Sequence, residues 1–261
     1  MHAALWVSKT GLSAQDTMLS TISNNLANVS TTGFKRDRPE FEDLLYQIKR
    51  QPGAQSTQDT QLPSGLQLGT GVRVAGTQKI FTTGTLQTTE QPLDMAINGR
   101  GFFQILMPDG NIGYTRDGSF HLDADGRIVT SNGYPLEPGI ELPPEVQTFT
   151  VGEDGTVSIS LFGEADVQEL GVVQTADFIN PAGLQAIGGN LFLETASSGA
   201  PQVGNPGENG LGTVLQNTLE NSNVSVVEEL VNMITTQRAY EMNSKVISTA
   251  DQMLQYISQN L

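Results

Sequence analysis

The sequence predicts an α+β protein with long N- and C-terminal helices, paired as a coiled-coil-like domain, and a central all-β domain inserted between them. Apolar side chains recur every seven residues near both ends of the chain, and a row with that spacing stays on one face of a helix. In the middle, Asp-Gly and Asn-Gly pairs recur at 109–110, 117–118, 125–126 and 132–133. This spacing leaves room only for short antiparallel strands.

The C-terminal segment, residues 225–261, contains no glycine or proline. It predicts a helix that begins after Ser225, with Glu228 three residues later as in a capping box. A two-stranded coiled coil needs a second apolar column, but here that column starts at Leu230 and then turns polar. We therefore expect one partner helix to leave apolar surface uncovered. The predicted C-terminal seam consists of Val226, Leu230, Met233, Tyr240, Ile247, Leu254 and Leu261.

Residues 1–34 predict a matching helix, interrupted only by Gly11 and ending near Gly33 and Phe34. We expect the two terminal helices to pair with each other, with the middle of the chain inserted between them. The predicted N-terminal seam consists of Leu5, Leu12, Leu19, Ile22, Leu26 and Val29.

The chain is expected to have three parts. Residues 1–34 and 224–261 form the terminal helical domain, 35–71 and 213–223 form an extended connector that is expected to bridge adjacent subunits, and 72–212 form the β domain. Within the connector, residues 54–71 are rich in Gln, Ser, Thr and Gly, which is typical of a disordered or extended loop that orders only against another surface. The strands expected from alternating patterns include residues 72–74, 80–82, 101–106, 148–151 and 157–159, the last two joined by a hairpin turn at Asp154-Gly155.

Composition excludes several classes of function. The 261 residues include no cysteine, so disulfides and thiolate metal sites are excluded. The net charge of −15 argues against nucleic acid, whose phosphates attract clustered cations, and suits a solvated surface. We expect no membrane span, because no run of about 18 apolar residues occurs, and no cleavable signal at the N-terminus.

No arrangement of residues indicates catalysis. The two histidines, His2 and His121, fall in different predicted domains, and the motifs of common nucleophiles, zinc sites and phosphate loops are absent. Asp117, Asp123 and Asp125 lack the ligand order and closing glutamate of a calcium loop, and hairpin turns explain them. We therefore expect no enzyme and no catalytic, cofactor-binding or metal-binding residues.

The helical ends predict self-assembly. Ordering long terminal segments is opposed by backbone entropy, and one pair of helices with these seams buries too little apolar surface to offset it. We expect the termini to be largely disordered in the free monomer and to fold when neighbouring subunits cover them. A repeated head-to-tail contact whose rotation does not close produces a helical filament. A different class remains open, a secreted β-domain binding module that works as a soluble monomer; sedimentation across concentration would distinguish the two.

Two long motifs, one near each end, resemble signatures of the bacterial flagellar rod and hook protein family. Residues 24–35 read NNLANVSTTGFK, and residues 221–241 read NSNVSVVEELVNMITTQRAYE. The stretches at 101–103 and 114–120 are similar to the β domain of the longer members. The motif residues at the N-terminal end are Asn24, Asn25, Ala27, Asn28, Gly33 and Phe34.

Within that family, the length excludes the short proximal rod proteins and the much longer hook protein. A further stretch resembles an insert that is associated with a straight, stiff rod, and it includes Pro52, Gly53, Leu62, Pro63, Gly65 and Leu66. The resemblance implies a structural homopolymer in the rod of the flagellar basal body, crossing the periplasm. It also implies export in an unfolded state through the flagellar type III apparatus. The implied partners are further copies of the chain, the proximal rod proteins, the hook protein and the surrounding L- and P-ring proteins.

Overall fold

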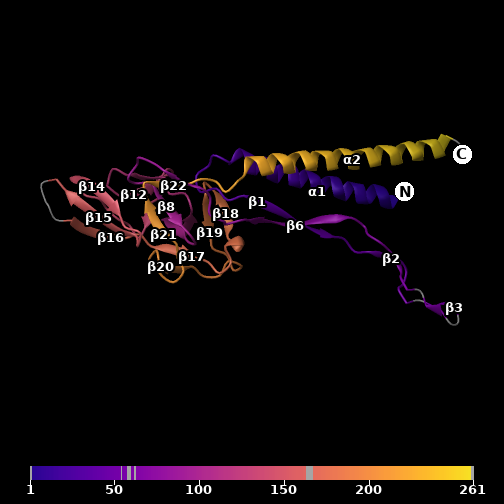
Figure 1. The fold of residues 1–261 in the computed structure, drawn as a ribbon, viewed down its shortest axis with the longest axis horizontal. Helices are drawn as coiled ribbons and strands as arrows, with labels where there is room; N and C mark the ends of the chain where they lie inside the picture. The colour runs from indigo at the N-terminus through magenta and orange to yellow at the C-terminus, as the bar shows by residue number, and fades with distance from the viewer. Residues whose placement is uncertain (1, 54, 58–59, 62, 163–166, 260–261) are drawn as a thin grey trace. The chain divides into compact units, whose positions relative to one another are not determined.

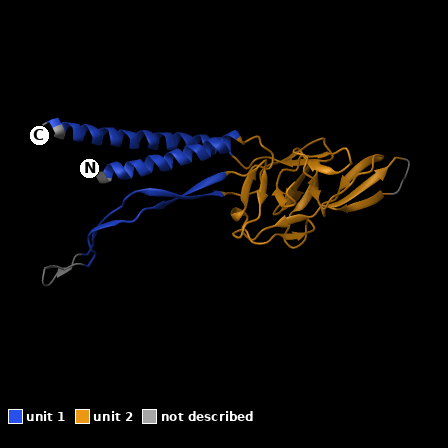
Figure 2. Ribbon diagram, turned by 180° about the vertical axis from the view of Figure 1, so that it is seen from behind, with its two compact units in different colours: residues 1–27, 37–78, 225–261 blue, residues 28–36, 79–224 orange. Residues whose placement is uncertain are grey.

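A computed structural model of the chain describes residues 2–53, 55–57, 60–61, 63–162 and 167–259. These residues form two compact units, coloured blue and orange in Figure 2. The first unit contains Met1–Ala27, Asp37–Gln78 and Ser225–Leu261, and the second contains Asn28–Arg36 and Lys79–Val224. Two long helices and many short strands confirm the predicted α+β class.

The two helices, α1 (His2–Ala27) and α2 (Val226–Gln259), lie side by side in the first unit (Figure 1). α1 ends before the predicted residue 34, because residues 28–33 form consecutive turns. Gly33 closes these turns at a φ of +68°, which favours glycine. α2 begins directly after Ser225, as predicted, and its first turn carries Glu228 and Glu229. Acidic groups there interact favourably with the positive end of the helix dipole.

A long hairpin completes the first unit. Its two arms pair as β1 (Asp37–Asp43) with β6 (Val72–Lys79), β2 (Gln47–Arg50) with β5 (Leu66–Leu68), and β3 (Gln55–Thr57) with β4 (Thr60–Gln61). The predicted strand at 72–74 is confirmed as part of β6. Residues 54–71 were expected to order only against another surface, and β5 is ordered in this way, because β2 supplies its backbone hydrogen-bond partners; β3 and β4 pair with each other.

The second unit is built from short strands, and its largest sheet has the order β18-β19-β10-β9-β17-β20, with β13 also paired to β9. These strands are β9 (Phe102–Leu106), β10 (Ile112–Thr115), β13 (Leu136–Glu137), β17 (Thr175–Asp177), β18 (Gln185–Gly188), β19 (Leu191–Leu193) and β20 (Gln202–Gly204). A 3-10 turn, η1 (Pro181–Gly183), precedes β18.

Four smaller sheets surround it. The three-stranded sheet consists of β14 (Val146–Val151), β15 (Thr156–Leu161) and β16 (Val167–Val172), which confirms the predicted hairpin across residues 154–155. The two-stranded pairs are β7 (Leu86–Thr88) with β22 (Thr218–Glu220), β8 (Met95–Asn98) with β21 (Thr213–Gln216), and β11 (Phe120–Leu122) with β12 (Ile128–Thr130).

β9 separates the two apolar clusters of this unit. Alternate side chains of a strand point to opposite faces, so Phe103 and Ile105 enter the larger cluster while Phe102 enters an aromatic one. In the aromatic cluster the rings of Tyr114 and Phe178 meet edge to face, with centroids 4.8 Å apart. The strong strand expected at 101–106 is thus confirmed as the centre of the unit.

Most of the predicted turns are present. Gly110, Gly126, Gly133 and Gly155 all have positive φ, as tight hairpin turns require. Gly118 does not, and the prediction of a hairpin at Asp117–Gly118 was wrong: the carbonyl of Gly118 accepts from the amide of Met95 over 3.0 Å, and the flanking strands β10 and β11 pair with other strands. The strand expected at 80–82 was also wrong. The backbone groups of Ile80 bond to Arg36 and to a side chain, not to a ladder of strands.

Candidate assembly surfaces

α1 and α2 approach each other closely at two places. A Cβ on Gly11 would lie 3.2 Å from Nδ2 of Asn243, so the glycine allows the helices to come together there. Further along, the buried Asn25 donates from Nδ2 to Oε1 of the buried Glu229, over 3.4 Å. Asn25 also holds both backbone groups of Asp37, because its Nδ2 donates to the carbonyl and its Oδ1 accepts from the amide, each over 2.9 Å. Gly11, which interrupts the sequence pattern, therefore has a packing role.

The predicted seam residues lie beside the most covered positions of the two helices. On α1, Ile22 is buried and Leu5, Leu12, Leu19 and Leu26 are half-buried; Val29 is half-buried in the turns that follow. On α2, Met233, Ile247 and Leu254 are half-buried, whereas Val226, Leu230 and Tyr240 are exposed; Leu261 lies outside the described residues. The coiled-coil pairing itself stays a prediction.

The best covered column of α2 is a different one. Its buried members are Glu229, Thr236 and Ala250, and Asn243, which faces Gly11, continues the same seven-residue spacing. This column was not predicted, because its members are not large apolar side chains. Short or polar residues at a seven-residue spacing were the available signal, since they let two helices approach closely.

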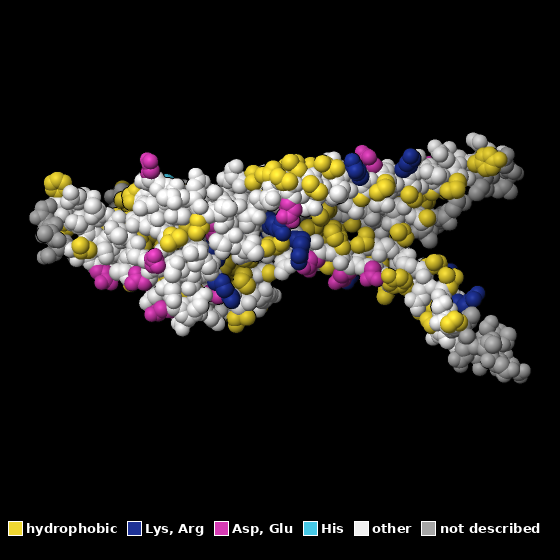
Figure 3. Space-filling view, in the orientation of Figure 1, with side chains coloured by type: hydrophobic (Ala, Val, Ile, Leu, Met, Phe, Trp, Pro, Cys, Tyr) yellow, Lys and Arg dark blue, Asp and Glu magenta, His cyan; other side chains and the backbone are white. Residues whose placement is uncertain are grey.

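α2 also exposes a row of large apolar side chains, which we call the outer face. Val227, Val231 and Ile234 are separated by four and three residues and therefore share one side of the helix. Their exposed fractions are 73, 54 and 50%. Apolar side chains gather along α2 in Figure 3. Met242, Val246, Met253 and Tyr256, further along the helix, are exposed as well. Contiguous apolar surface of this kind marks an interaction site.

The hairpin carries a second group of exposed apolar side chains: Phe41, Leu45, Tyr46, Ile48, Leu66 and Leu68. Of the predicted bridging residues, Pro52 and Gly53 form the turn after β2, Pro63 is exposed, and Leu62 lies outside the described residues. Gly65 packs against the other arm, where a Cβ would lie 2.5 Å from the carbonyl oxygen of Arg50. The hairpin is tied to α1 by Thr10, whose Oγ1 accepts from the amide of Val72 over 3.3 Å.

In the second unit, two cations share one buried carboxylate. Lys35 Nζ donates to Glu220 Oε1 over 2.6 Å, and Arg116 Nη1 donates to Glu220 Oε2 over 3.4 Å. All three side chains are at most 3% exposed. Burial lowers the pKa of Lys35, and the charge of Glu220 opposes that shift. Arg116 also donates from Nη2 to the carbonyl of Gly99 over 2.6 Å, and its guanidinium lies 5.4 Å from the ring centroid of Phe102.

One of the family-motif residues named above, Gly33, contacts this cluster. The amide of Gly33 donates to the carbonyl of Glu220 over 2.7 Å, and a Cβ at Gly33 would lie 2.6 Å from the backbone of Arg116. Lys79 Nζ lies 5.2 Å from the ring centroid of Phe34. Asn24 and Ala27 are exposed near the end of α1, and Asn28 is half-buried in the following turns. The motif is recognisable in the sequence, but the buried ion cluster at its end was not predicted.

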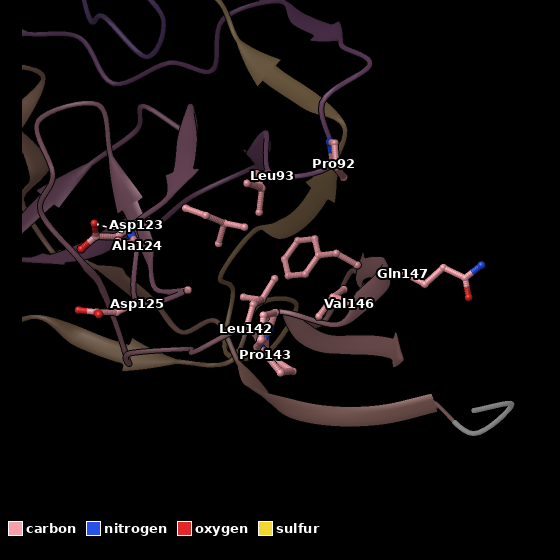
Figure 4. A pocket seen from close by; sticks show the side chains of 13 residues that line it. Pro92, Leu93, Asp123, Ala124, Asp125, Leu142, Pro143, Val146 and Gln147 are labelled. Carbon is pink, nitrogen blue, oxygen red and sulfur yellow. Dashed lines mark hydrogen bonds between the residues drawn. The ribbon is translucent and has the colours of Figure 1, made fainter. Parts of the chain in front are cut away.

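A groove of about 520 Å³ lies on the second unit (Figure 4). Leu93 and Leu142 line it, with Asp123 and Asp125 at one edge, and both aspartates pair with Arg127. Within the described ranges, no three His, Asp or Glu side chains are placed to hold a metal ion. No helix in the part of the chain that the structure describes is long and apolar enough to cross a membrane.

Comparisons with known proteins agree across the chain. Residues 5–35 match the family model "Flagella basal body rod protein", residues 96–159 match "Flagellar hook protein FlgE/F/G D1 domain", and residues 215–260 match "Flagellar basal body rod FlgEFG protein C-terminal". The flagellar basal-body rod protein FlgG of Buchnera aphidicola from Schizaphis graminum is 55% identical over 99% of this chain and 100% of its own length. The proteins of that name from Borreliella burgdorferi and Bacillus subtilis are 50% and 37% identical, over at least 97% of each chain.

Proposed function

The chain belongs to the family of the flagellar basal-body rod protein FlgG, and from this premise we propose that it forms the helical tubular distal rod of the bacterial flagellar basal body. In that position it is a stiff drive shaft that transmits torque to the hook. The observation that carries the proposal is the outer face of α2, where Val227, Val231 and Ile234 remain at least half exposed although α1 already packs against the helix. A structural polymer covers such a surface with the next subunit.

The terminal residues 1–34 and 224–261 are the polymerisation domain of this proposal. Their helices pair in a coiled-coil-like manner within one subunit and line the inner tube of the rod, while the β domain faces outward. Because the pairing leaves the outer face open, each subunit offers the same apolar surface to a neighbour, and repetition of one contact builds the filament. The exposed side chains explain why the termini fold fully only on assembly.

The hairpin is the bridging element of the proposal. It presents Leu45 at 90% exposure and Ile48 at 61%, and a two-stranded hairpin with such exposed side chains is only marginally stable in water without a partner. In the rod, these side chains cover a neighbouring subunit and oppose bending. This role favours the distal rod over the related proximal rod protein FlgF, since the hairpin includes the stretch that FlgF largely lacks. The further partners are the proximal rod proteins, the hook protein, the L- and P-ring proteins and the type III export apparatus.

Deletion of residues 225–261 tests the polymerisation role. The purified full chain is expected to sediment as polymer above a critical concentration, and the truncated chain as a monomer at every concentration. Native-like tubes from the truncated chain would overturn the role of the helices. A full chain that stays monomeric at every concentration would instead favour the alternative of a soluble β-domain binding module.

A second deletion tests the hairpin separately. Joining Arg50 to Leu66 through a two-residue turn removes the distal part and keeps the pairing of β2 with β5. Filaments are expected to form but to bend more, which electron micrographs measure as a shorter persistence length. Complementation distinguishes the two rod positions, because the full chain should restore motility to a strain that lacks FlgG and not to one that lacks FlgF.

A further inference from the structure

The chain passes between the second unit and the first at four positions. The second unit consists of Asn28–Arg36 and Lys79–Val224, so the chain enters or leaves it next to residues 28, 36, 79 and 224. Any force that the backbone carries into this unit must pass through these connections. The segments next to three of them, 33–36, 80–84 and 220–223, are bonded to one another.

Asn223 joins all three connections through its amide group. Its Oδ1 accepts from the amide of Arg36 over 2.8 Å, and its Nδ2 donates to the carbonyl of Ile80 over 2.7 Å. The carbonyl of Arg36 in turn accepts from the amide of Ile80 over 3.0 Å. One side chain therefore holds the backbone of two other segments in place of a regular strand pairing.

Glu220 makes the second set of links. Its Oε1 accepts from both Lys35 Nζ and the amide of Gly84, over 2.6 and 2.8 Å, and Lys35 Nζ also donates to the carbonyl of Thr82 over 2.8 Å. Arg116 connects the same carboxylate to the strands of the core, because its Nη1 donates to the carbonyl of Ile97. The three connecting segments are thus bonded both to each other and to the folded interior.

We propose that Lys35, Arg116, Glu220 and Asn223, the anchor cluster, are positioning residues that fix the chain connections of the second unit and carry mechanical load into it. The inference rests on the proposed function only for the load itself. Separating the segments would leave buried charges without their opposite charge, which is strongly unfavourable, so the cluster resists opening more than neutral hydrogen bonds would. The anchor cluster also gives the two family motifs a common role, since Lys35 and Gly33 belong to the N-terminal motif and Asn223 belongs to the C-terminal one.

Hydrogen exchange of the full chain tests the cluster directly. The substitution Glu220→Gln keeps the size of the side chain and removes its charge. The amides of Gly33, Arg36 and Gly84 are expected to exchange at least about a hundredfold faster, and up to a few thousandfold, the range expected when one partner of a buried ion pair is lost. Asn223→Ala is the milder second variant, and it should release the Arg36 amide most strongly because that amide bonds to the lost oxygen.

Two controls separate anchoring from general stability. Val157→Ala removes methyl groups from a fully buried core position far from the cluster in sequence, and should speed exchange throughout the second unit without singling out these three amides. Glu42→Gln removes an exposed ion pair with Arg73 and should change none of them. If Glu220→Gln and Asn223→Ala gave the uniform pattern of Val157→Ala, the anchoring role would be refuted.

The mechanical part has its own measurement. Cells whose rods carry Asn223→Ala or Glu220→Gln should rotate normally at low viscosity and lose rotation as the viscosity of the medium rises, whereas Val157→Ala cells should follow the wild type at every viscosity. Equal load dependence of all variants would refute the load-carrying role. If cells that lack this chain stayed motile, the proposed function would be refuted. The hydrogen-exchange result would still test the anchoring role independently.

Discussion

Replacing the three outer-face residues of α2 by glutamine should prevent assembly without weakening the helix. Glutamine has a higher helix propensity than valine or isoleucine, so the triple change Val227→Gln, Val231→Gln and Ile234→Gln leaves the intrinsic stability of α2 unchanged or slightly greater. The three side chains are 50–73% exposed, and a helix covered only by α1 therefore loses little packing. Any large effect must come from contacts with other subunits.

The size of the effect follows from the exposed fractions. Full burial of one such side chain stabilises a contact by about 1.5–3 kcal/mol. The exposed fractions of the three side chains add up to somewhat less than two fully exposed side chains, and this is the apolar surface that assembly can still bury. Losing this burial weakens each subunit contact by about 3–5 kcal/mol, and the critical concentration rises by roughly two to three and a half orders of magnitude. Pelleting of polymer from a concentration series measures the shift.

A matched variant outside the helices controls for added polarity. Ile179→Gln changes a side chain that is 76% exposed in the second unit, and it should leave the critical concentration within a few-fold of the wild type. Circular dichroism adds a second readout, because helix content should rise on assembly of the wild type and stay constant in the triple variant. An unchanged critical concentration in the triple variant would refute the view that α2 covers its apolar face with neighbouring subunits.

Two further predictions concern the second unit. Gly33→Ala should destabilise it by clearly more than Gly133→Ala, measured by thermal unfolding; both positions have positive φ, a conformation that costs alanine about 1–2 kcal/mol, but only Gly33 faces backbone within 2.6 Å. Equal losses would mean that the contact with Arg116 is unimportant. Burial, and secondarily Glu194, raises the pKa of Tyr114 to about 12, so the folded state keeps a phenolic proton that the unfolded chain releases near pH 10. The contribution of this group to the free energy of unfolding is therefore complete below pH 10 and is lost as the pH rises to 12. Tyr114→Phe should reduce the fall of the free energy of unfolding over this pH range, measured by denaturant unfolding.

The elements with strong local signals could be predicted from the sequence. The periodicity of residues 225–261 predicts α2 with its start at Ser225, and the apolar run at 101–106 predicts β9. Both depend on patterns that a neighbour does not alter. The turns at Gly110 and Gly155 also follow local signals, since glycine adopts positive φ without steric cost.

The parts that depend on distant partners could not be predicted in the same way. Gln-, Ser- and Thr-rich segments have no apolar pattern, yet β5 is ordered because β2, about twenty residues earlier, satisfies its backbone. Gly118 has the sequence of a hairpin turn, but the approach of Met95 decides its conformation. Lys35 and Glu220 are 185 positions apart, and nothing in either local sequence indicates that a lysine and a glutamate will be buried together.

Two asparagines, one from each family motif, perform the same task in the two units. Asn25 binds the amide and carbonyl of Asp37, and Asn223 binds the amide of Arg36 and the carbonyl of Ile80. An asparagine side chain offers one acceptor and two donors in the geometry of a peptide group, so it can replace a neighbouring strand where the backbone leaves regular structure. Aspartate would lack the donor, and serine would reach only one group. The two asparagines therefore hold consecutive residues, Arg36 at the end of one segment of the second unit and Asp37 at the start of the next segment of the first unit.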